Sequence, residues 1–244
     1  MISSFRPGCR RHSRTNVVGK FILFDLDDTL YRETDWRSSG LEAVSRIVAD
    51  RSSSSTEQVL ALLQELDAQA HENLFDRLLE RVPVDGLGVS ELVEGFRYHK
   101  PVGVDMFPMA RGFLEACPLP TGIVTDGLWG AQLRKVEALR VRELVGPVVI
   151  TDLLAADRAA WKPSKLPFLT ATSALGARPE EGLYVADNPG KDFVAPNELG
   201  MRSIQVRHPG QVHSVTPVDA AHAASLSVDG WGELVGALHE FMGD

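Results

Sequence analysis

Cysteines and long apolar runs are both scarce in this 244-residue sequence. The two cysteines, Cys9 and Cys117, are too few and too far apart for a disulfide framework or a cysteine-based zinc site. The sequence has no run of about 18 consecutive apolar residues, which excludes a transmembrane helix. Because disulfides accumulate in oxidising compartments, the scarcity of cysteine favours a cytoplasmic protein. The lack of a long apolar run predicts that the protein has no membrane partner.

Acidic residues are missing from the first 20 positions, although these carry five of the 25 lysines and arginines. The other 20 cations face 33 acidic residues, so the rest of the chain has a net charge of −13. Proteins bind nucleic acids through clustered Lys and Arg, and a body this acidic is predicted not to bind them. A phosphate group would have to be bound locally, by a few side chains and backbone amides.

Residues 1–19 differ in composition from the rest of the chain. They contain no apolar stretch long enough for a secretory signal peptide. Their Arg- and Ser-rich, acid-free composition is similar to that of an organellar transit segment. A basic disordered tail is the preferred interpretation of these residues.

Short buried strands alternate with helices along most of the chain. Residues 20–30 read KFILFDLDDTL, an apolar run ending in carboxylates, as expected for a strand buried on both faces of a parallel sheet. Runs at 122–126, 147–152 and 182–187 share this form, 201–206 is a fifth candidate strand, and helical patterns at 129–139 and 165–175 supply crossovers. The predicted fold is α/β with a Rossmann-like parallel sheet. Ligands bind such sheets at the carboxyl ends of the strands, the expected location of Asp25, Asp126, Asp152 and Asp187.

Residues 31–101 interrupt the alternation of strands and helices. They contain helical patterns at 36–49, 56–81 and 89–98, with Thr56 expected to cap the second helix. We predict a small helical domain at 31–101, inserted into a core domain formed by residues 20–30 and 102–244. The length agrees with one core and a modest insert, because single cores stop growing at roughly 250 to 300 residues.

Asp25 and Asp27 lie two residues apart at the end of the first predicted strand. At this spacing the side chains of a regular strand point the same way. One carboxylate could attack a substrate while the other transfers a proton. The alternative is that Asp25, Asp27 and Asp28 are only polar residues that end a strand, and the triplet alone does not decide between the two interpretations.

Two later segments carry weaker indications of a phosphate site. Thr125, Asp126 and Gly127 follow the second strand, where a hydroxyl and backbone amides that open a helix could bind an oxyanion. Lys162 stands just ahead of a helix, where its ammonium could offset neighbouring carboxylates and a bound phosphate. Taken alone, the first segment also fits an ordinary strand-to-helix turn, and Lys162 fits a solvated surface lysine.

Asp187 and Asp192 follow another buried strand. Their carboxylates would complete an oxygen-rich site of the kind that Mg²⁺ prefers. Acidic residues are common in loops, so this pair by itself is a weak indication of a metal site.

In their order along the chain, these four segments resemble the motifs of the haloacid dehalogenase superfamily, whose members are mostly phosphatases. FDLDDTL at 24–30 is similar to the first motif and IVTDG at 123–127 to the second. WKP at 161–163 is similar to the third and VADNPGKDF at 185–193 to the fourth. The resemblance extends over residues 20–206, and the insert resembles the helical cap of the first type in that family.

The resemblance implies a role for each motif residue. Asp25 would be the nucleophile that forms an aspartyl-phosphate, and Asp27 would be the acid for the leaving alcohol and then the base for water. Lys162 would be a catalytic residue that shields Asp25 from the charge of the phosphoryl group. The implied phosphate ligands are Thr125, Asp126, Gly127 and Lys162. The implied ligands of Mg²⁺ are Asp25, the Asp27 carbonyl, Asp187 and Asp192.

The third motif departs from the pattern of the family. Ser164, Lys165 and Leu166 follow Pro163, where an acid and a second proline are common, and Lys165 is therefore a competing candidate for the cationic role. Polar residues on helices are often only solvated, but five residues of the insert are candidates for contacting the distal end of a substrate: His71, Arg77, Arg97, His99 and Lys100.

The sequence predicts a Mg²⁺-dependent phosphatase that acts on a small soluble phosphate monoester of a sugar, polyol or small acid. A cap over the site would exclude a protein or polynucleotide substrate. Residues 132–139 and 187–193 most resemble the sugar- and triose-phosphate phosphatases. The alternatives are a phosphomutase, a 2-haloacid dehalogenase, which would not need Asp27, and a non-catalytic binding module. A monomer or homodimer is expected.

Overall fold

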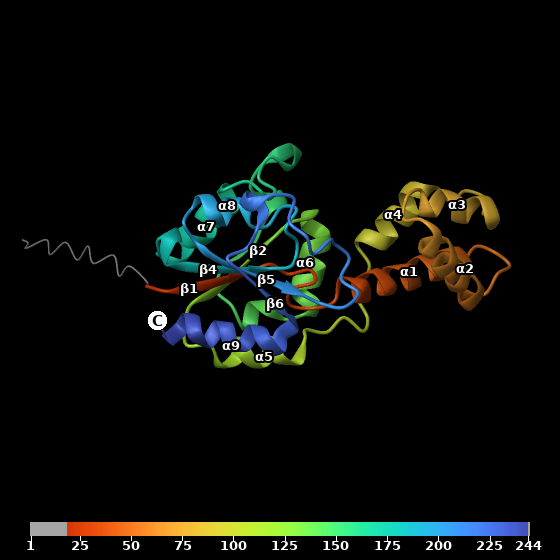
Figure 1. Cartoon of the computed structure of the whole chain (residues 1–244). Coiled ribbons are helices and arrows are strands. Elements are labelled where there is room, and N and C mark those ends of the chain that lie inside the picture. The colour runs from red at the N-terminus through yellow and green to blue at the C-terminus, as the bar shows by residue number, and fades with distance from the viewer. Residues whose placement is uncertain (1–18, 244) are drawn as a thin grey trace, which may run out of the picture.

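A computed structural model of the protein describes residues 19–243, which form an α/β core and a smaller helical unit (Figure 1). The predicted basic tail lies outside the described residues, apart from Gly19. Among the helices of residues 19–243, none has both the length and the apolar character needed to cross a membrane.

The core is built on one sheet whose strands are all parallel, in the order β3-β2-β1-β4-β5-β6. The central strands β1, β2 and β4 are buried at every position, which explains why they read as continuous apolar runs. The α/β, Rossmann-like prediction is confirmed. The strands are β1 (Phe21–Phe24), β2 (Thr121–Thr125), β3 (Val148–Ile150), β4 (Gly182–Ala186), β5 (Arg202–Arg207) and β6 (Leu226–Asp229).

Helices cover both faces of the sheet (Figure 1). One face packs against α5 (Pro108–Ala116), α6 (Trp129–Ala138) and α9 (Gly230–Gly243), and the other against α7 (Leu166–Leu175) and α8 (Val194–Glu198). Short 3₁₀ turns fill several connections: Val141–Glu143, Thr151–Leu153, Ala156–Arg158, Pro179–Glu181 and Ala220–His222. The helical unit lies next to the sheet edge that is formed by the carboxyl ends of the strands (Figure 1).

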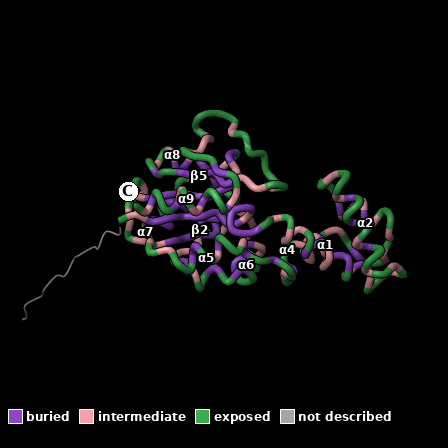
Figure 2. The backbone as a smooth tube through the Cα atoms, turned by 60° about the horizontal axis from the view of Figure 1, so that its bottom comes forward, coloured by how far each residue is buried: buried purple, intermediate pink, exposed green. Residues whose placement is uncertain are grey.

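The helical unit consists of α1 (Glu33–Ala49), α2 (Thr56–Gln69), α3 (Leu74–Arg81) and α4 (Val89–Arg97). Its helices share an apolar cluster of their own, in which Val44, Leu63, Leu78 and Leu92 are fully buried. Figure 2 shows these buried segments apart from those of the sheet. The unit therefore has a small apolar core of its own, separate from the clusters that pack on the sheet.

Two details of the insert differ from the sequence predictions. The helix predicted at 56–81 is two helices, because Ala70 is extended and Asn73 adopts a left-handed conformation with φ 51°. The residue that caps α2 is Ser55 and not Thr56. The Ser55 hydroxyl accepts a hydrogen bond from the Gln58 amide, and the Gln58 side chain accepts one from the Ser55 amide, forming a capping box.

Two details of the core differ as well. The predicted strand at 147–152 ends at Ile150, because Thr151–Leu153 forms a 3₁₀ turn. Strand β6 has no counterpart among the predicted strands. It is an edge strand with only Val228 buried, so it lacks the apolar run by which the inner strands are recognised.

The chain crosses between the two parts at residues 25–32 and 98–107. Asp28, with φ 46°, holds the first crossing: its Oδ1 accepts from the Glu33 amide at 2.9 Å, where α1 begins. The two crossings are also joined to each other, since the Phe107 amide donates to the Leu30 carbonyl at 2.9 Å. The helical unit is thus attached next to the carboxyl end of β1.

Candidate active site

The carboxyl ends of β1, β2 and β4 open into a cleft of about 420 Å³ between the core and the helical unit. Glu33 and Arg97 reach this cleft from the helical unit, one from each end of it. From the core, the acidic and glycine residues that line it are Asp25, Asp27, Asp126, Gly127 and Asp187. Segments far apart in the sequence are therefore brought to one site, as expected at this edge of an open parallel sheet.

Asp25 directly follows β1 and is 2% exposed. Its carboxylate oxygens lie 2.9 Å from Lys162 Nζ and 3.3 Å from Lys191 Nζ. Burial would raise the pKa of Asp25, but the two ammonium groups outweigh burial and lower it to about 2. Asp25 is therefore a buried carboxylate that stays ionised, the form required of a nucleophile.

Lys162 is held in place from several directions. Its ammonium lies 2.7 Å from Asp192 Oδ1 and donates to the Tyr184 hydroxyl at 3.0 Å. Its backbone amide donates to Asp126 Oδ1 at 3.1 Å. Burial lowers the pKa of Lys162, but the carboxylates of Asp192 and Asp25 raise it well above its usual value, so the ammonium is retained.

The competing lysine, Lys165, lies away from the cleft. Its side chain is 45% exposed and its ammonium is 2.8 Å from Glu198 on the surface. A lysine that sequence reasoning did not single out, Lys191, instead joins Lys162 beside Asp25 and lies 2.9 Å from Asp192. Lys191 could have been recognised as a site residue from its position in the fourth segment, next to Asp192.

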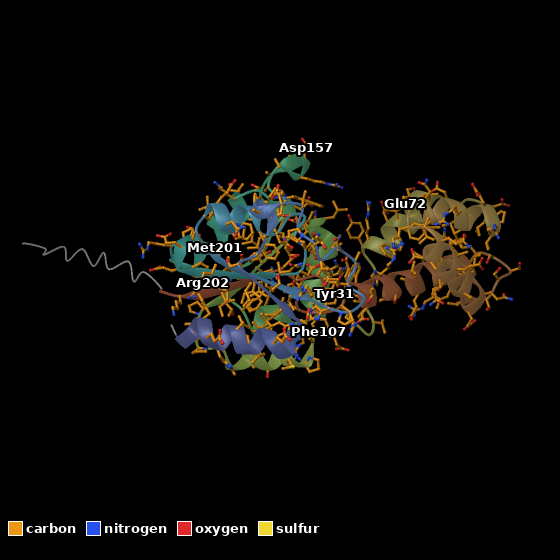
Figure 3. The ribbon with its side chains drawn as sticks, in the orientation of Figure 1. Tyr31, Glu72, Phe107, Asp157, Met201 and Arg202 are labelled. Carbon is orange, nitrogen blue, oxygen red and sulfur yellow. The ribbon has the colours of Figure 1, made fainter. Side chains whose placement is uncertain are left out.

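Asp27 lines the same cleft as Asp25, and three donors surround its carboxylate. Lys135 Nζ lies 2.6 Å from Oδ1, Gln132 Nε2 donates to Oδ2 at 2.9 Å, and the Tyr31 hydroxyl donates to Oδ1. Figure 3 labels Tyr31 at the end of the core that faces the helical unit. Sequence reasoning missed all three donors, because a lysine and a glutamine on a helix read as ordinary surface residues.

Thr125 and Gly127 provide a space where an oxyanion could bind. Among the described residues, the buried Thr125 hydroxyl has no hydrogen-bond partner. Gly127 has φ 135°, and a Cβ there would lie 2.5 Å from the Gln132 side chain, so only glycine fits this turn. One oxygen of the Asp126 side chain, Oδ1, accepts from the Lys162 amide and from the Thr151 hydroxyl at 2.8 Å, and the other lies 3.9 Å from Lys191 Nζ.

Asp25, Asp187 and Asp192 form an acidic cluster whose candidate ligand atoms all lie within 4.8 Å of one another. Burial and the carboxylates of Asp192 and Asp25 raise the pKa of Asp187 well above its usual value. Asp187 Oδ2 is buried and has no hydrogen-bond partner in residues 19–243. An unsatisfied, crowded carboxylate of this kind fits a divalent cation bound by oxygen ligands.

Several residues with polar side chains considered from the sequence lie outside the cleft. Asp152 caps α6 by accepting from the Trp129 amide at 2.9 Å. His71 pairs with Asp67, and Arg77 donates to backbone carbonyls at the end of α2. His99 is buried against the Trp36 ring, with 4.3 Å between ring centroids. Of the five insert candidates, Arg97 is the one that lines the cleft.

Comparison with known proteins agrees with this geometry. The sequence profile of haloacid dehalogenase-like hydrolases matches residues 22–206, which contain every motif residue described above. The chain belongs to this family of hydrolases. The family resemblance and the hydrolase class predicted from the sequence are confirmed.

Two curated relatives carry the name glyceraldehyde 3-phosphate phosphatase. The protein from Methanopyrus kandleri is 28% identical over 238 residues, covering 92% of this chain and 99% of the relative. The protein from Methanocaldococcus jannaschii is 27% identical over 200 residues, covering 77% of this chain and 84% of the relative.

Solved structures show the same fold. A 2-haloacid dehalogenase from Pseudomonas syringae has a TM-score of 0.60 at 20% identity, covering 92% of this chain and all of that one. A phosphatase of the family from Thermococcus onnurineus has a TM-score of 0.56 at 21% identity, covering 90% and 97%. Both comparisons cover the core and the helical unit together.

Proposed function

We propose that this family member is a phosphatase that hydrolyses a small phosphate monoester through a covalent phosphate on Asp25. The observation that carries the proposal is the buried, ionised Asp25 carboxylate between two lysines, beside the unpartnered Thr125 hydroxyl. A phosphate dianion approaches a carboxylate only when cations offset both charges, and Lys162 and Lys191 supply two positive charges at this point.

In the first step an Asp25 carboxylate oxygen attacks phosphorus and the bond from phosphorus to the ester oxygen breaks. The Thr125 hydroxyl and the amide of Gly127 hold the phosphoryl oxygens, whose charge Lys162 offsets. Asp27 enters this step protonated and gives that proton to the leaving oxygen, which departs as an alcohol, and Asp27 is left as a carboxylate paired with Lys135.

In the second step water attacks phosphorus and the Asp25 oxygen–phosphorus bond breaks. Asp27, now a carboxylate, takes a proton from that water. Inorganic phosphate leaves, and both aspartates return to their initial states. Asp27 thus serves as acid and then as base. This requires its carboxyl group to reach the leaving ester oxygen and the attacking water, which both lie on the side of phosphorus opposite Asp25.

The acidic cluster fits Mg²⁺, with the carboxylates of Asp25 and Asp187, the Asp27 carbonyl and Asp192 as the residues that would hold it. When bound, the ion supplies positive charge that offsets the phosphoryl oxygens. Asp192 accepts from the Asn188 amide at 3.0 Å and pairs with Lys162 and Lys191. Besides binding the ion, it would therefore hold these lysines and the neighbouring ligands in place.

The proposed substrates are small sugar, polyol or acid phosphates, with triose phosphates first among them. The cleft volume suits a small molecule, and the curated relatives are named for a triose phosphate. Glu33 and Arg97 would contact the part of the substrate that leaves as the alcohol. Dehalogenation of a 2-haloacid is less well supported, because it requires no proton donor at Asp27.

The test is a screen of sugar, polyol and carboxylate phosphates at matched concentrations, with release of inorganic phosphate as the readout. An aryl phosphate and a 2-haloacid are assayed in parallel. Phosphate release that disappears in Asp25→Asn is expected. Halide release without phosphate release by the parent protein would contradict the proposal, and so would full phosphatase activity in Asp25→Asn.

A further inference from the structure

We infer that Lys135 and Gln132 on α6 are positioning residues for Asp27, aiming its carboxylate at the ester oxygen. The inference rests on the proposed function and adds two residues that act through the acid and base. Neither residue belongs to the four motif segments, and both come from one helix that follows the second segment.

The contacts fix both oxygens of the Asp27 carboxylate. Lys135 Nζ lies 2.6 Å from Oδ1, and Gln132 Nε2 donates to Oδ2 at 2.9 Å. The Tyr31 hydroxyl also donates to Oδ1, so Lys135 shares that oxygen with Tyr31, while Gln132 holds the other one. Donors on both oxygens oppose rotation of the carboxylate about its last bond. The pair is also largely shielded from water, since the side chains of Lys135 and Asp27 are 7% and 18% exposed.

The placement of the two donors follows from the helix. Residues three apart lie on the same face of a helix, so Gln132 and Lys135 both face Asp27. The start of α6 is held to the core, because Asp152 Oδ2 accepts from the Trp129 amide at 2.9 Å. The donors therefore stand on a rigid element, as positioning a proton-transfer group requires.

A buried ammonium is costly unless it is paired, which argues that Lys135 is held here for its partner. The Trp36 ring of the helical unit covers it, with 5.1 Å from Lys135 Nζ to the ring centroid. The ring covers the ammonium, whose ion-pair contact among the described residues is with Asp27. The sequence alone does not distinguish the buried Lys135 from the neighbouring Arg134, which is exposed.

The expected consequence depends on the leaving group. A phosphate ester with a poor leaving group, such as an alkyl phosphate, needs a well-aimed proton from Asp27. An activated aryl phosphate leaves with little help. Misplacing Asp27 should therefore slow alkyl phosphates strongly and aryl phosphates weakly, whereas general damage to the fold would slow both alike.

The experiment measures kcat and KM of Lys135→Met for a graded series of aryl phosphates and for an alkyl phosphate that the parent hydrolyses. We expect kcat for the alkyl phosphate to fall about 100-fold and kcat for the most activated aryl phosphate to fall only a few-fold, with KM little changed. Lys135→Arg should recover part of the alkyl phosphate activity. The matched control is Arg134→Met, next to it on the exposed side of α6, which should behave as the parent.

Gln132→Met is the second variant and should show the same dependence on the leaving group, so the result does not rely on one variant folding. Thermal unfolding of each variant reports on the fold. An equal loss for all leaving groups, or no loss in either variant, would overturn the inference while leaving the proposed function intact. A parent protein that hydrolyses no phosphate in the series would overturn the proposed function first, and this inference with it.

Discussion

The two walls of the cleft differ in how their charges are paired. On the core wall Asp25, Asp192, Lys162 and Lys191 contact one another within 3.3 Å. On the wall of the helical unit, Arg97 has no hydrogen bond or ion pair to any residue that the structure describes. The contact of the Glu33 carboxylate in the ion pairs of residues 19–243 is with the His213 ring, at 4.0 Å. The core charges are therefore fixed before a substrate arrives, and those of the helical unit remain free to bind one.

This difference indicates a division of labour. Preorganised charges stabilise a transition state without rearranging, which is what the chemical step needs. Unpaired groups can instead pair with whatever leaving group is present. If the division is correct, variants of these four core residues should change the rate for every substrate, and variants of Glu33 and Arg97 should change the preference among substrates.

The largest effect is expected for Asp25→Asn, which tests the core wall. The amide is close in shape to the carboxylate but cannot attack phosphorus, so kcat should fall by at least about 10⁴-fold for all substrates. Lys162 keeps Asp192 as its partner, and the fold should survive. The measurement is kcat with natural and aryl phosphates, together with a thermal unfolding curve. A loss confined to some substrates would contradict the division between the walls.

The core wall was also the part that the sequence predicted best. A strand buried on both faces has a recognisable apolar run, and the residue after it lies at the ligand-binding edge whatever the rest of the fold does. Asp25, Thr125 and Asp187 were located in this way. Lys162 follows a 3₁₀ turn and no strand, so its position before a helix is only a weak indication, which the family resemblance strengthens.

The sequence did not predict the contacts that side chains on helices make in the cleft. Lys135 and Gln132 occur in a helical pattern where polar side chains usually face solvent, and only the packing of α6 against the cleft brings them to Asp27. Tyr184 was read as one more apolar residue of β4, although its hydroxyl contacts Lys162. Such contacts depend on the relative placement of elements, which periodicity does not contain.

Metal removal is the second prediction and concerns the acidic cluster of the core. Excess chelator should reduce phosphatase activity by about 100-fold or more, since the charge of the phosphoryl oxygens is then offset less. In the chelated protein, added Mg²⁺ should raise the melting temperature, because a ligand that binds only the folded state stabilises it by mass action. Asp187→Asn should reduce that rise, while Asp157→Asn, on an exposed turn, should not. Full activity in chelator would exclude the metal site.

The third prediction tests the wall of the helical unit through Arg97→Ala. If Arg97 pairs with the leaving portion of the substrate, the variant should raise KM for the preferred phosphate about 10-fold. A small aryl phosphate, which does not reach Arg97, should be hydrolysed as by the parent. Arg81→Ala, at the exposed end of α3, is the control from the same unit. Equal changes for both substrates would mean that specificity lies in the core.

The last prediction concerns Glu33→Gln, measured as stability against pH in the chelated protein. Burial and the nearby Asp27 carboxylate raise the pKa of Glu33 from 4.5 to about 7. Below pH 4.5 the carboxyl is protonated in the folded and unfolded states, so it adds no pH-dependent term. Between pH 4.5 and 7 the unfolded chain ionises first, and the parent should lose stability that the variant keeps. Above pH 7 the variant should therefore be the more stable protein by about 3 kcal/mol, relative to their difference at pH 4. Urea unfolding at pH 4, 6 and 8 measures this difference. If the difference in stability between the parent and Glu33→Gln were the same at all three pH values, Glu33 would be paired and ionised like the carboxylates of the core. The contrast between the two walls would then be wrong at this residue.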